Sequence, residues 1–235
     1  MRNTITFGSV TSSTYGVYIS GSGVFNSPEK EYDYISVPGR NGDLIGNERR
    51  MSNIKVTYPA FIYSSFKSNL RSFLSALTAI EGYKELTDTY HTDEYRMASF
   101  TGNVKVKPQG RLNAGEFDLV FNCKPQRYLT TGKTAVNFLT NGSIQNDTAF
   151  HSAPLIKVYG YGTLTIGSTV ITIVDVYPYI CIDSDIMDCY YESTNANDQV
   201  TMSSGNFPTL APGSNTVSFT GNITKVEITP RWFRV

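Results

Sequence analysis

Residues 116–134 read EFDLVFNCKPQRYLTTGKT, a regular pattern followed by an irregular one. In the first eight residues apolar and polar side chains alternate, which predicts a half-buried β-strand because successive side chains of a strand point to opposite faces. The apolar positions on one side are Phe117, Leu119, Phe121 and Cys123. From 122 to 134 the periodicity is lost, while a proline, a glycine and several threonines appear. This stretch is the predicted boundary between two domains, residues 1–130 and 131–235.

The first half contains one clear helix pattern, SSFKSNLRSFLSALTAIEGY (64–83). Its apolar residues have the one-sided spacing of an amphipathic helix. They are Phe66, Leu70, Phe73, Leu74 and Leu77. We predict a helix over about 65–80, with Ser64 or Ser65 as its N-cap and Gly82 at its end.

Before this helix, NIKVTYPAF (53–61) alternates, with Ile54, Val56 and Tyr58 on one face, so we predict a strand. Pro59 has no N–H to donate to a neighbouring strand. We therefore expect the strand to end at Pro59 or to lie at a sheet edge.

The second half shows hairpin patterns. TLTIGSTVITIV (163–174) is two alternating runs joined by Gly167-Ser168, which predicts a two-residue turn with glycine first. TVSFTGNITKVEIT (216–229) has the same design around Gly221-Asn222 and predicts a second hairpin. The 16 Tyr and 13 Phe also suit pleated, half-buried surfaces. We predict a mainly β fold, with one helix in the first domain.

Charge and cysteine content argue against several classes of protein. The 20 basic and 20 acidic residues balance, which disfavours nucleic acid or an anionic membrane as the main partner. No apolar run is long enough to span a membrane, and MRNTITFGSV lacks the apolar core of a secretory signal, so we expect a cytoplasmic origin. Cys123, Cys181 and Cys189 are too sparse for a disulfide framework, and we expect Cys123 to be a small buried apolar residue.

Motifs for nucleotide binding and nucleophilic catalysis are incomplete. Gly132-Lys133-Thr134 resembles the end of a phosphate-binding loop, but Arg127 stands where that loop needs its first glycine. GYGTLTIG, from Gly160, lies between predicted strands and opens no helix, so it is no dinucleotide fingerprint. No G-x-S-x-G elbow occurs, and two histidines leave few ways to build a Ser-His-Asp site.

CIDSDIMDC (181–189) places Asp183, Asp185 and Asp188 between two cysteines. Its spacing fits neither an EF-hand, which needs glycine at the sixth position and glutamate at the twelfth, nor a zinc knuckle. We predict an acidic turn between strands and no metal site.

YKELTDTYHTDEYRMASFTGNVKV (83–106) gathers the ionisable groups of an active site in one short run, which we call the elbow. Asp88, His91, Asp93 and Glu94 are close in sequence, but carboxylates so near each other on one turn rarely face each other across a glycosidase cleft. A catalytic histidine also needs a nucleophile or a metal, and the run offers neither. We predict a structural turn leading into a strand, and a protein that is not an enzyme.

In this interpretation, Asp88 and Asp93 accept hydrogen bonds from local backbone N–H groups. Tyr90 and Tyr95 would cover the junction between the turn and the following strand, and Arg96 would pair with a neighbouring carboxylate.

Three segments, taken in order with these features, resemble the distal tail protein family of long-tailed phages that infect Gram-positive bacteria. They are the Gly-Arg-Asn-Gly turn at 39–42, the L-x-D-x-Y…Y-R-x-A block at 86–98 and the Pro-x-Arg-Tyr junction at 125–128. The resemblance covers essentially the whole chain and is weaker over 170–235. Gln126 departs from it, because a second aromatic or small residue is expected there. By this resemblance the elbow is a framework segment.

The resemblance implies a structural protein at the tip of a siphovirus tail, in the virion, assembled in the cytoplasm of the bacterial host. The N-terminal domain would be a β-sandwich with one helix and an extended hairpin, closing into a hexameric ring around the channel for DNA. The C-terminal domain would be a galectin-like or carbohydrate-binding-module-like β-sandwich. The implied partners are further copies in single or stacked rings, the tail tube protein, and fibre, lysin or receptor-binding proteins. DNA is only passing cargo, the protein is not inserted in a membrane, and no cofactor is implied.

The residues also give a reason to expect assembly. YGVYISGSGVF (15–25) predicts a strand that stays unpaired within one subunit, and an exposed strand edge is a template for a neighbouring subunit. The charged residues expected to complement each other at this ring contact are Arg40, Asp43, Glu48, Arg49 and Arg50.

The alternative function is a carbohydrate-binding module that recognises host cell-wall sugars through the C-terminal sandwich. A sugar site presents an exposed aromatic platform beside polar groups, and Tyr159 and Tyr161 are the candidates for it. Tyrosines of a sandwich also pack at strand ends, and we predict no tight monosaccharide binding.

Overall fold

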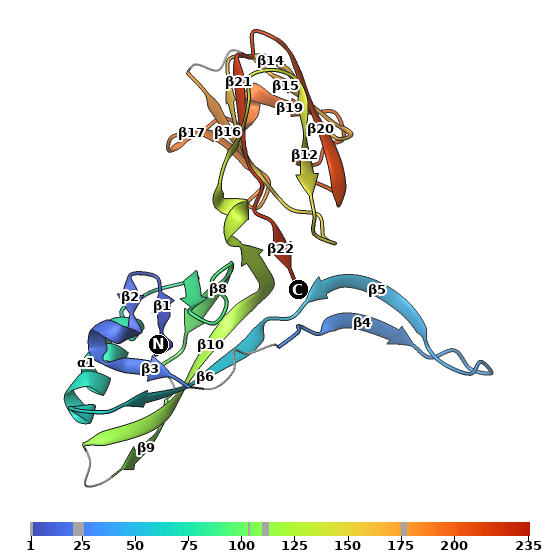
Figure 1. The fold of residues 1–235 in the computed structure, drawn as a ribbon. Helices are drawn as coiled ribbons and strands as arrows, with labels where there is room; N and C mark the ends of the chain where they lie inside the picture. The colour runs from blue at the N-terminus through green and yellow to red at the C-terminus, as the bar shows by residue number, and fades with distance from the viewer. Residues whose placement is uncertain (1, 21–25, 103, 110–112, 175–177) are drawn as a thin grey trace. The chain divides into compact units, whose positions relative to one another are not determined.

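The computed structural model describes residues 2–20, 26–102, 104–109, 113–174 and 178–235, without the side chains of Asn47, Glu48, Arg49, Pro108 and Gln109 (Figure 1). The chain divides into two compact units, Met1–Arg127 with Val235 and Tyr128–Arg234. Both are built mainly from antiparallel strands, which confirms the predicted fold class. Among these residues, no helix has the length and apolar character needed to cross a bilayer.

The first unit is built on a curled antiparallel sheet with the strand order β2-β1-β7-β8-β10-β6-β3, and with β9 beside β10. A bridge between Asn3 and Ile19 links the residues before β1 to β3 at the other end of that order, so the sheet curls around its core. The strands are β1 (Ile5–Phe7), β2 (Val10–Thr11), β3 (Val17–Ile19), β6 (Ile54–Ile62), β7 (Lys84–Asp88), β8 (Glu94–Phe100), β9 (Lys105–Gln109) and β10 (Ala114–Leu129). A 3-10 turn, η1 (Ser12–Tyr15), lies between β2 and β3.

Strand β10 confirms the predicted alternation and extends beyond it. Phe117, Leu119, Phe121 and Cys123 are all buried and face the core. From Lys124 to Leu129 the chain remains a strand, but every side chain there is half-buried, so alternation cannot be seen in the sequence. A 3-10 turn, η3 (Thr130–Lys133), follows. The stretch 122–134 is therefore not an irregular linker. The boundary between 130 and 131 stays a prediction.

Strand β6 continues through Pro59 and lies between β10 and β3, so both expectations for it, an end at Pro59 and a place at the sheet edge, are wrong. Burial alternates strictly from Ile54 to Ile62. The carbonyl of Pro59 accepts a hydrogen bond from Ser20 N–H at 2.7 Å, so its missing N–H faces the β3 side, where β3 pairs only with residues 60–62. Pro59 thus lies beyond the end of β3 and removes no ladder hydrogen bond.

Helix α1 (Phe66–Thr78) lies within the predicted range, but its ends differ from the prediction. Ser65 stands at the N-cap with a positive φ of 53°, and its side chain makes no cap hydrogen bond. Instead, the N–H of Phe66 donates to the carbonyl of Asn113 at 3.1 Å. The helix stops before Gly82, whose φ of 69° belongs to the turn toward β7. Its buried residues are Phe66, Phe73 and Leu77.

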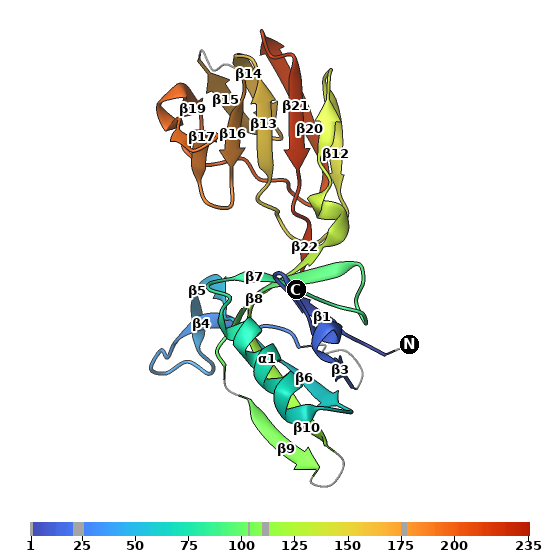
Figure 2. The ribbon, with the colours of Figure 1, turned by 90° about the vertical axis from the view of Figure 1, so that its left-hand side faces the viewer.

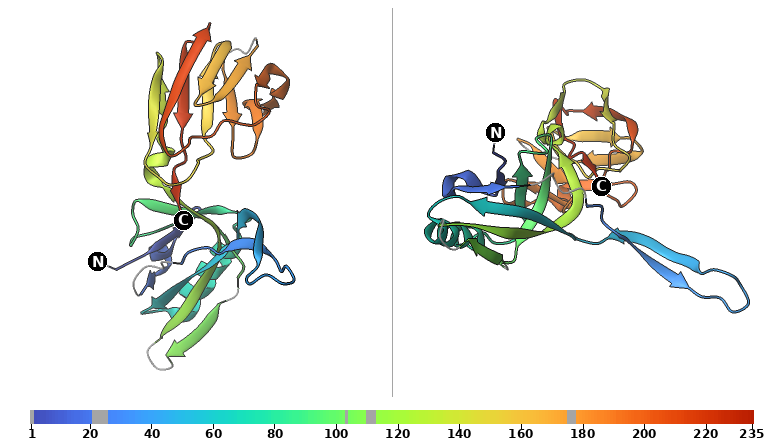
Figure 3. Two further views of the ribbon diagram at one scale, coloured as in Figure 1. Left: turned by 90° about the vertical axis from the view of Figure 1, so that its right-hand side faces the viewer. Right: turned by 60° about the horizontal axis from the view of Figure 1, so that its bottom comes forward.

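Strands β4 (Lys30–Ile35) and β5 (Leu44–Met51) form a two-stranded sheet of their own, which we call the arm (Figure 3, right). Its register shifts between Glu31 and Tyr32 and again between Tyr32 and Tyr34. Neither strand pairs with the curled sheet among the described residues.

The second unit is a sandwich of two antiparallel sheets (Figure 2). One has the order β11-β21-β13-β16-β17-β18 and the other β12-β20-β14-β15-β19, and the core lies between them. The strands are β11 (Val136–Phe138), β12 (Gly142–Asn146), β13 (Leu155–Tyr159), β14 (Gly162–Ile166), β15 (Thr169–Ile173), β16 (Ile180–Asp183), β17 (Asp188–Tyr191), β18 (Thr194–Asn195), β19 (Val200–Met202), β20 (Gly213–Gly221) and β21 (Lys225–Thr229). A last strand, β22 (Phe233–Arg234), belongs to neither of these two sheets and pairs with β10. A 3-10 turn, η4 (Asn197–Gln199), precedes β19.

Of the two predicted hairpins, one is confirmed and one is wrong. β14 and β15 pair directly across Gly167-Ser168, and Gly167 has the positive φ that the turn requires. β20 and β21, however, lie in different sheets, so the chain crosses the sandwich after Gly221 instead of turning back. The crossing packs backbone to backbone against the one between β13 and β14. A Cβ on Gly160 or Gly162 would overlap the carbonyl of Asn222 or Thr220, which is why GYGTLTIG needs its first two glycines.

Candidate functional site

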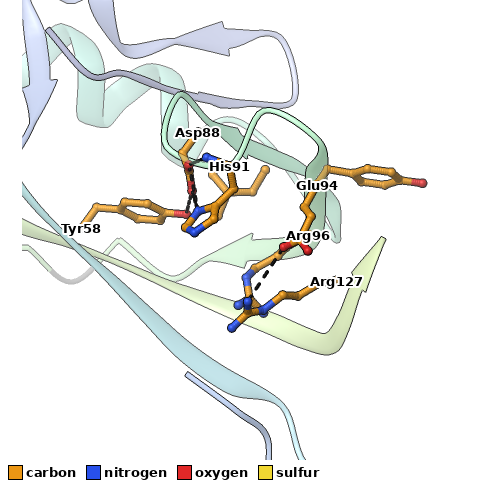
Figure 4. Close-up of a pocket in the computed structure, with 8 residues that line it drawn as sticks. Tyr58, Asp88, His91, Glu94, Arg96 and Arg127 are labelled. Atoms are coloured by element: carbon orange, nitrogen blue, oxygen red, sulfur yellow. Dashed lines mark hydrogen bonds and ion pairs between the residues drawn. The ribbon is translucent and has the colours of Figure 1, made fainter. Parts of the chain in front are cut away.

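The elbow (83–106) contains β7, β8 and the short connection between them at 89–93, and Asp88 organises this connection (Figure 4). One oxygen of Asp88 accepts hydrogen bonds from the N–H groups of Tyr90 at 2.9 Å and His91 at 2.8 Å, as predicted. The His91 ring lies 3.2 Å from the same oxygen. The other oxygen accepts from the Tyr58 hydroxyl at 2.8 Å. Asp88 is thus used to hold the turn, and the corresponding role of Asp93 stays a prediction.

Tyr58 cannot act as a base in this arrangement. Burial, and then the charge of Asp88 and the hydrogen bond to it, raise the pKa of Tyr58 far above its ordinary value, so the phenol remains protonated and donates. Tyr58 comes from β6 and lies 30 residues before Asp88, so sequence spacing offered no signal for this contact.

The predicted ion pair of Arg96 is wrong. Arg127, from β10, is the arginine that approaches a carboxylate of the elbow, with its Nη1 3.9 Å from Oε2 of Glu94. The Arg96 side chain enters the same pocket, but no ion pair within 4 Å involves it in the described part of the chain. The alternation of β8 places Arg96 on its buried side, which the charged sequence around it did not indicate.

The pocket bounded by these groups has a volume of only about 20 Å³, enough for one water-sized guest. Its lining residues are Tyr58, Leu86, Asp88, His91, Glu94, Tyr95, Arg96 and Arg127. Such a space cannot hold a sugar or a peptide next to His91. The geometry therefore favours the predicted structural role of the elbow.

The arm contains the residues predicted for a ring contact. Arg40 and Asp43 lie in the connection between β4 and β5, and Arg50 lies in β5; all three are exposed. The side chains of Glu48 and Arg49 lie outside the described residues. The strand predicted over 15–25 to stay unpaired is not free where it is described, because β3 pairs with β6 of the same chain. Residues 21–25 lie outside the described part.

What the sequence missed is the apolar character of the arm. Its exposed apolar side chains are Tyr34, Ile35, Leu44 and Ile45, with exposed fractions of 64%, 52%, 38% and 53%. A lone two-stranded hairpin is marginally stable in water, because nothing covers either of its faces. The only available signal was the run of apolar residues on both sides of the Gly-Arg-Asn-Gly turn. The arm is therefore a candidate interface, because the described residues of its own unit leave these apolar side chains exposed.

The two candidate sugar-binding tyrosines differ in exposure and in their contacts. Tyr159 is half-buried in β13, its ring packs 5.7 Å from that of Tyr179, and its hydroxyl donates to Glu227 at 3.3 Å. Tyr161 lies in the crossing between β13 and β14 and is 46% exposed. The ammonium of Lys157 lies 3.7 Å from the centre of the Tyr179 ring and 5.3 Å from that of Tyr159. Lysine thus occupies positions where a sugar would stack.

The predicted acidic turn and two of the cysteines have structural roles. Asp183, in the predicted acidic turn, accepts two hydrogen bonds from Arg231 at 2.6 and 2.8 Å, and these lower the pKa of its carboxyl against the opposing effect of burial. Burial raises the pKa of Cys123 to about 11 and that of Cys189 to about 12, so both stay protonated thiols at neutral pH. Within the described ranges, no three acidic, histidine or cysteine side chains are grouped as a metal site.

Comparison with known proteins shows a likeness in fold. No protein-family model and no curated protein matches the sequence. The crystal structure of SPP1 Dit (gp 19.1), described as a paradigm of the hub adsorption apparatus in phages that infect Gram-positive bacteria, aligns with a TM-score of 0.70. The alignment covers 97% of this chain and 98% of that chain, with 11% identity.

Two structures of the phage P2 baseplate in its activated conformation are also similar. The one with Ca aligns with a TM-score of 0.55 and 12% identity, over 97% of each chain. The one with Sr aligns with a TM-score of 0.52 and 12% identity, over 97% of this chain and 96% of that chain. At the level of the fold, the predicted resemblance to the distal tail proteins is confirmed.

Proposed function

We propose that this protein is a structural hub component of a phage tail tip. One observation carries the proposal: both units together, and not one of them alone, align with SPP1 Dit over 97% of this chain and 98% of that chain. A fold hosts many functions, so the extent of the match matters more than its existence. The elbow supports a structural role as well, because its carboxylate Asp88 is used to hold a turn.

The hub is proposed to be a hexameric ring closed by the arm. An exposed apolar hairpin is stabilised when a second copy covers it, since burying apolar surface contributes about 25 cal/mol per Å². A head-to-tail contact, in which the arm of one copy lies on a different surface of the next, repeats around a ring and closes. The charges of Arg40 and Asp43, in the connection at the end of the arm, would then help to fix the alignment of the two copies.

The family resemblance supplies the rest of the proposal. The ring would surround a channel for DNA, join the tail tube protein, and carry fibre, lysin or receptor-binding proteins at the tip of the virion. The galectin-like character of the second unit also stays a prediction. No separate observation favours sugar binding, so it is not proposed as a function.

The test is native mass spectrometry with negative-stain microscopy on the full chain near micromolar concentration. We expect species of six or twelve copies and ring-shaped particles. The double variant Ile35→Asp/Ile45→Asp should be a folded monomer, because two buried charges without partners are costly at an interface. A wild-type protein that stays monomeric at this concentration would contradict the ring.

A matched control is the double variant Leu139→Asp/Val174→Asp, which changes two exposed apolar residues of the second unit, 72% and 56% exposed. It should assemble like the wild type. Rings formed by the arm variant and lost in this control would place the contact in the second unit and overturn the role of the arm.

A further inference from the structure

The sequence contains two Asn-Gly pairs, Asn41-Gly42 in the connection at the end of the arm (Figure 3, right) and Asn141-Gly142 at the start of β12. In such a pair the backbone nitrogen of the glycine can attack the amide carbon of the asparagine side chain. Glycine favours this attack because it has no Cβ to hinder the approach. Both pairs are exposed, so access of solvent does not distinguish them. The structure distinguishes them by how firmly each pair is held.

The pair in the arm has no hydrogen bond that would hold its reacting atoms apart. Among the described residues, neither the side chain of Asn41 nor the N–H of Gly42 takes part in one. The turn before the pair is closed by the N–H of Arg40, which donates to the carbonyl of Val37 at 3.1 Å, and strand β5 begins only at Leu44. A Cβ built on Gly42 would meet no atom within 4 Å. The side chain of Asn41 can therefore turn toward the nitrogen of Gly42 without breaking any of these contacts.

The pair in the second unit is held on both sides of its reacting bond. The side-chain oxygen of Asn141 accepts a hydrogen bond from the N–H of Phe219 at 2.9 Å. Gly142 is the first residue of β12 and pairs with Val217 of β20. A Cβ on Gly142 would lie 3.1 Å from the ring of Phe138, so this glycine is also closely packed. The amide of Asn141 can reach its glycine only after the end of β12 opens, and such local opening costs free energy.

We propose that Asn41 is a site of spontaneous deamidation in the exposed end of the arm. The nitrogen of Gly42 forms a bond to Cγ of Asn41 while the bond between Cγ and Nδ2 breaks. The proton of the Gly42 N–H ends on the leaving NH₂ group, so ammonia departs and a cyclic succinimide remains. Water then opens this ring. Addition at Cγ gives aspartate, and addition at the backbone carbonyl carbon gives iso-aspartate, in which the main chain runs through Cβ and Cγ.

Either product changes the charge at the end of the arm. Arg40 and Asp43 carry opposite charges on the two sides of the Asn-Gly pair, and a carboxylate at position 41 makes this connection negative. Iso-aspartate also adds one methylene to the backbone between β4 and β5. The reaction needs only water and no partner, so it does not depend on the proposed ring. It alters the same part of the molecule that is the candidate interface.

The test follows both Asn-Gly pairs in the same sample of the full chain, incubated in mildly alkaline buffer at physiological temperature. Digestion after lysine keeps each pair inside one peptide, 31–55 or 134–157, and fragmentation in the mass spectrometer separates aspartate from iso-aspartate. Conversion at Asn41 should be at least about tenfold faster than at Asn141, the ratio that an opening free energy of about 1.4 kcal/mol produces. The arm variant Ile35→Asp/Ile45→Asp is measured beside the wild type, so that covering of the arm in a ring cannot hide the reaction. Conversion at Asn41 no faster than at Asn141 in this variant would overturn the proposal.

Two controls separate the effect of the fold from that of the local sequence. In denaturant neither pair is held, so the two rates should become similar. A ratio that persists in denaturant would assign the difference to the neighbouring residues and reject the structural argument. Gly42→Ala places a Cβ beside the attacking nitrogen and should slow conversion at Asn41 while leaving that at Asn141 unchanged. An unchanged rate at Asn41 in this variant would contradict attack by the nitrogen of residue 42.

Discussion

Two hairpins of this protein have a similar local design and opposite surroundings. β14–β15 lies between β20 and β19 in a sheet of the second unit and buries Leu164, Ile166, Ile171 and Ile173 in the core of the sandwich. Among the described residues, no further strand pairs with the arm, β4–β5, and its apolar side chains are exposed. The same kind of strand pairing therefore faces a buried core in β14–β15 and leaves an exposed apolar surface in the arm.

The difference shows that a hairpin derives its stability from the layer that covers its apolar face. Backbone pairing alone leaves a two-stranded ribbon marginal in water. For β14–β15 that layer is the other sheet of the same unit. For the arm, no such layer exists among the described residues of its own unit, and in the proposed ring a second copy would supply it.

The largest effect on folding stability is expected in the embedded hairpin. Leu164→Ala removes a fully buried side chain and leaves a cavity, which should lower the free energy of unfolding by about 2–5 kcal/mol. Ile45→Ala in the arm, where the side chain is exposed in the monomer, should change it by no more than about 0.5 kcal/mol. Denaturant unfolding of both variants under monomeric conditions gives the values. Similar losses for the two would mean that the chain covers its own arm.

Limited proteolysis can compare the arm in the monomer, where it is exposed, with the arm in the proposed ring, where a second copy would cover it. Trypsin should cut after Arg40, in the connection between β4 and β5. The cut should be at least about tenfold faster in the monomeric arm variant than in the ring. This ratio corresponds to about 1.4 kcal/mol in the free energy of exposing the cleavage site. Digestion is followed by mass spectrometry. Equal rates at Arg40 would contradict the covering of the arm.

The same digest tests the predicted division of the chain at 130 and 131. Lys133 is exposed in η3 and should be cut equally in both forms, which makes it the internal control. Lys124 and Arg127 are half-buried in β10 and should resist. Fragments that end in the middle of either half would reject the division.

The smallest effect is expected for His91 of the elbow, because the turn is held by the carboxylate of Asp88 and not by the histidine ring. His91→Ala should leave assembly intact and change the free energy of unfolding by about 0.5 kcal/mol, because the backbone of the turn is held by Asp88. Asp88→Ala should cost more, about 1–3 kcal/mol, since it leaves the hydroxyl of Tyr58 without its acceptor. Thermal or denaturant unfolding measures both. A hydrolytic activity lost in His91→Ala would overturn the structural role of the elbow.

Residue patterns predicted the elements that bury one face. The strand around Phe117, the strand around Val56, the helix from Phe66 and the turn at Gly167 are all present, because each has one apolar face and one polar face that a period of 2 or 3.6 makes visible. The pattern failed at Gly221, where two runs that look like a hairpin belong to different sheets. It also failed from Lys124 to Leu129, where both faces are half-buried.

The sequence by itself determined a neutral charge and predicted a mainly β chain with one helix and an elbow with a structural role. These properties depend on neighbours in the chain, and local spacing records them. Only the tertiary structure decided that β3 pairs within its own subunit, that Tyr58 rather than a nearby residue completes the elbow, that Arg96 and Arg127 meet, and that the arm is left uncovered. Each of these depends on residues far apart in sequence, whose contacts are selected by the packing of whole layers and leave no periodic trace in either segment.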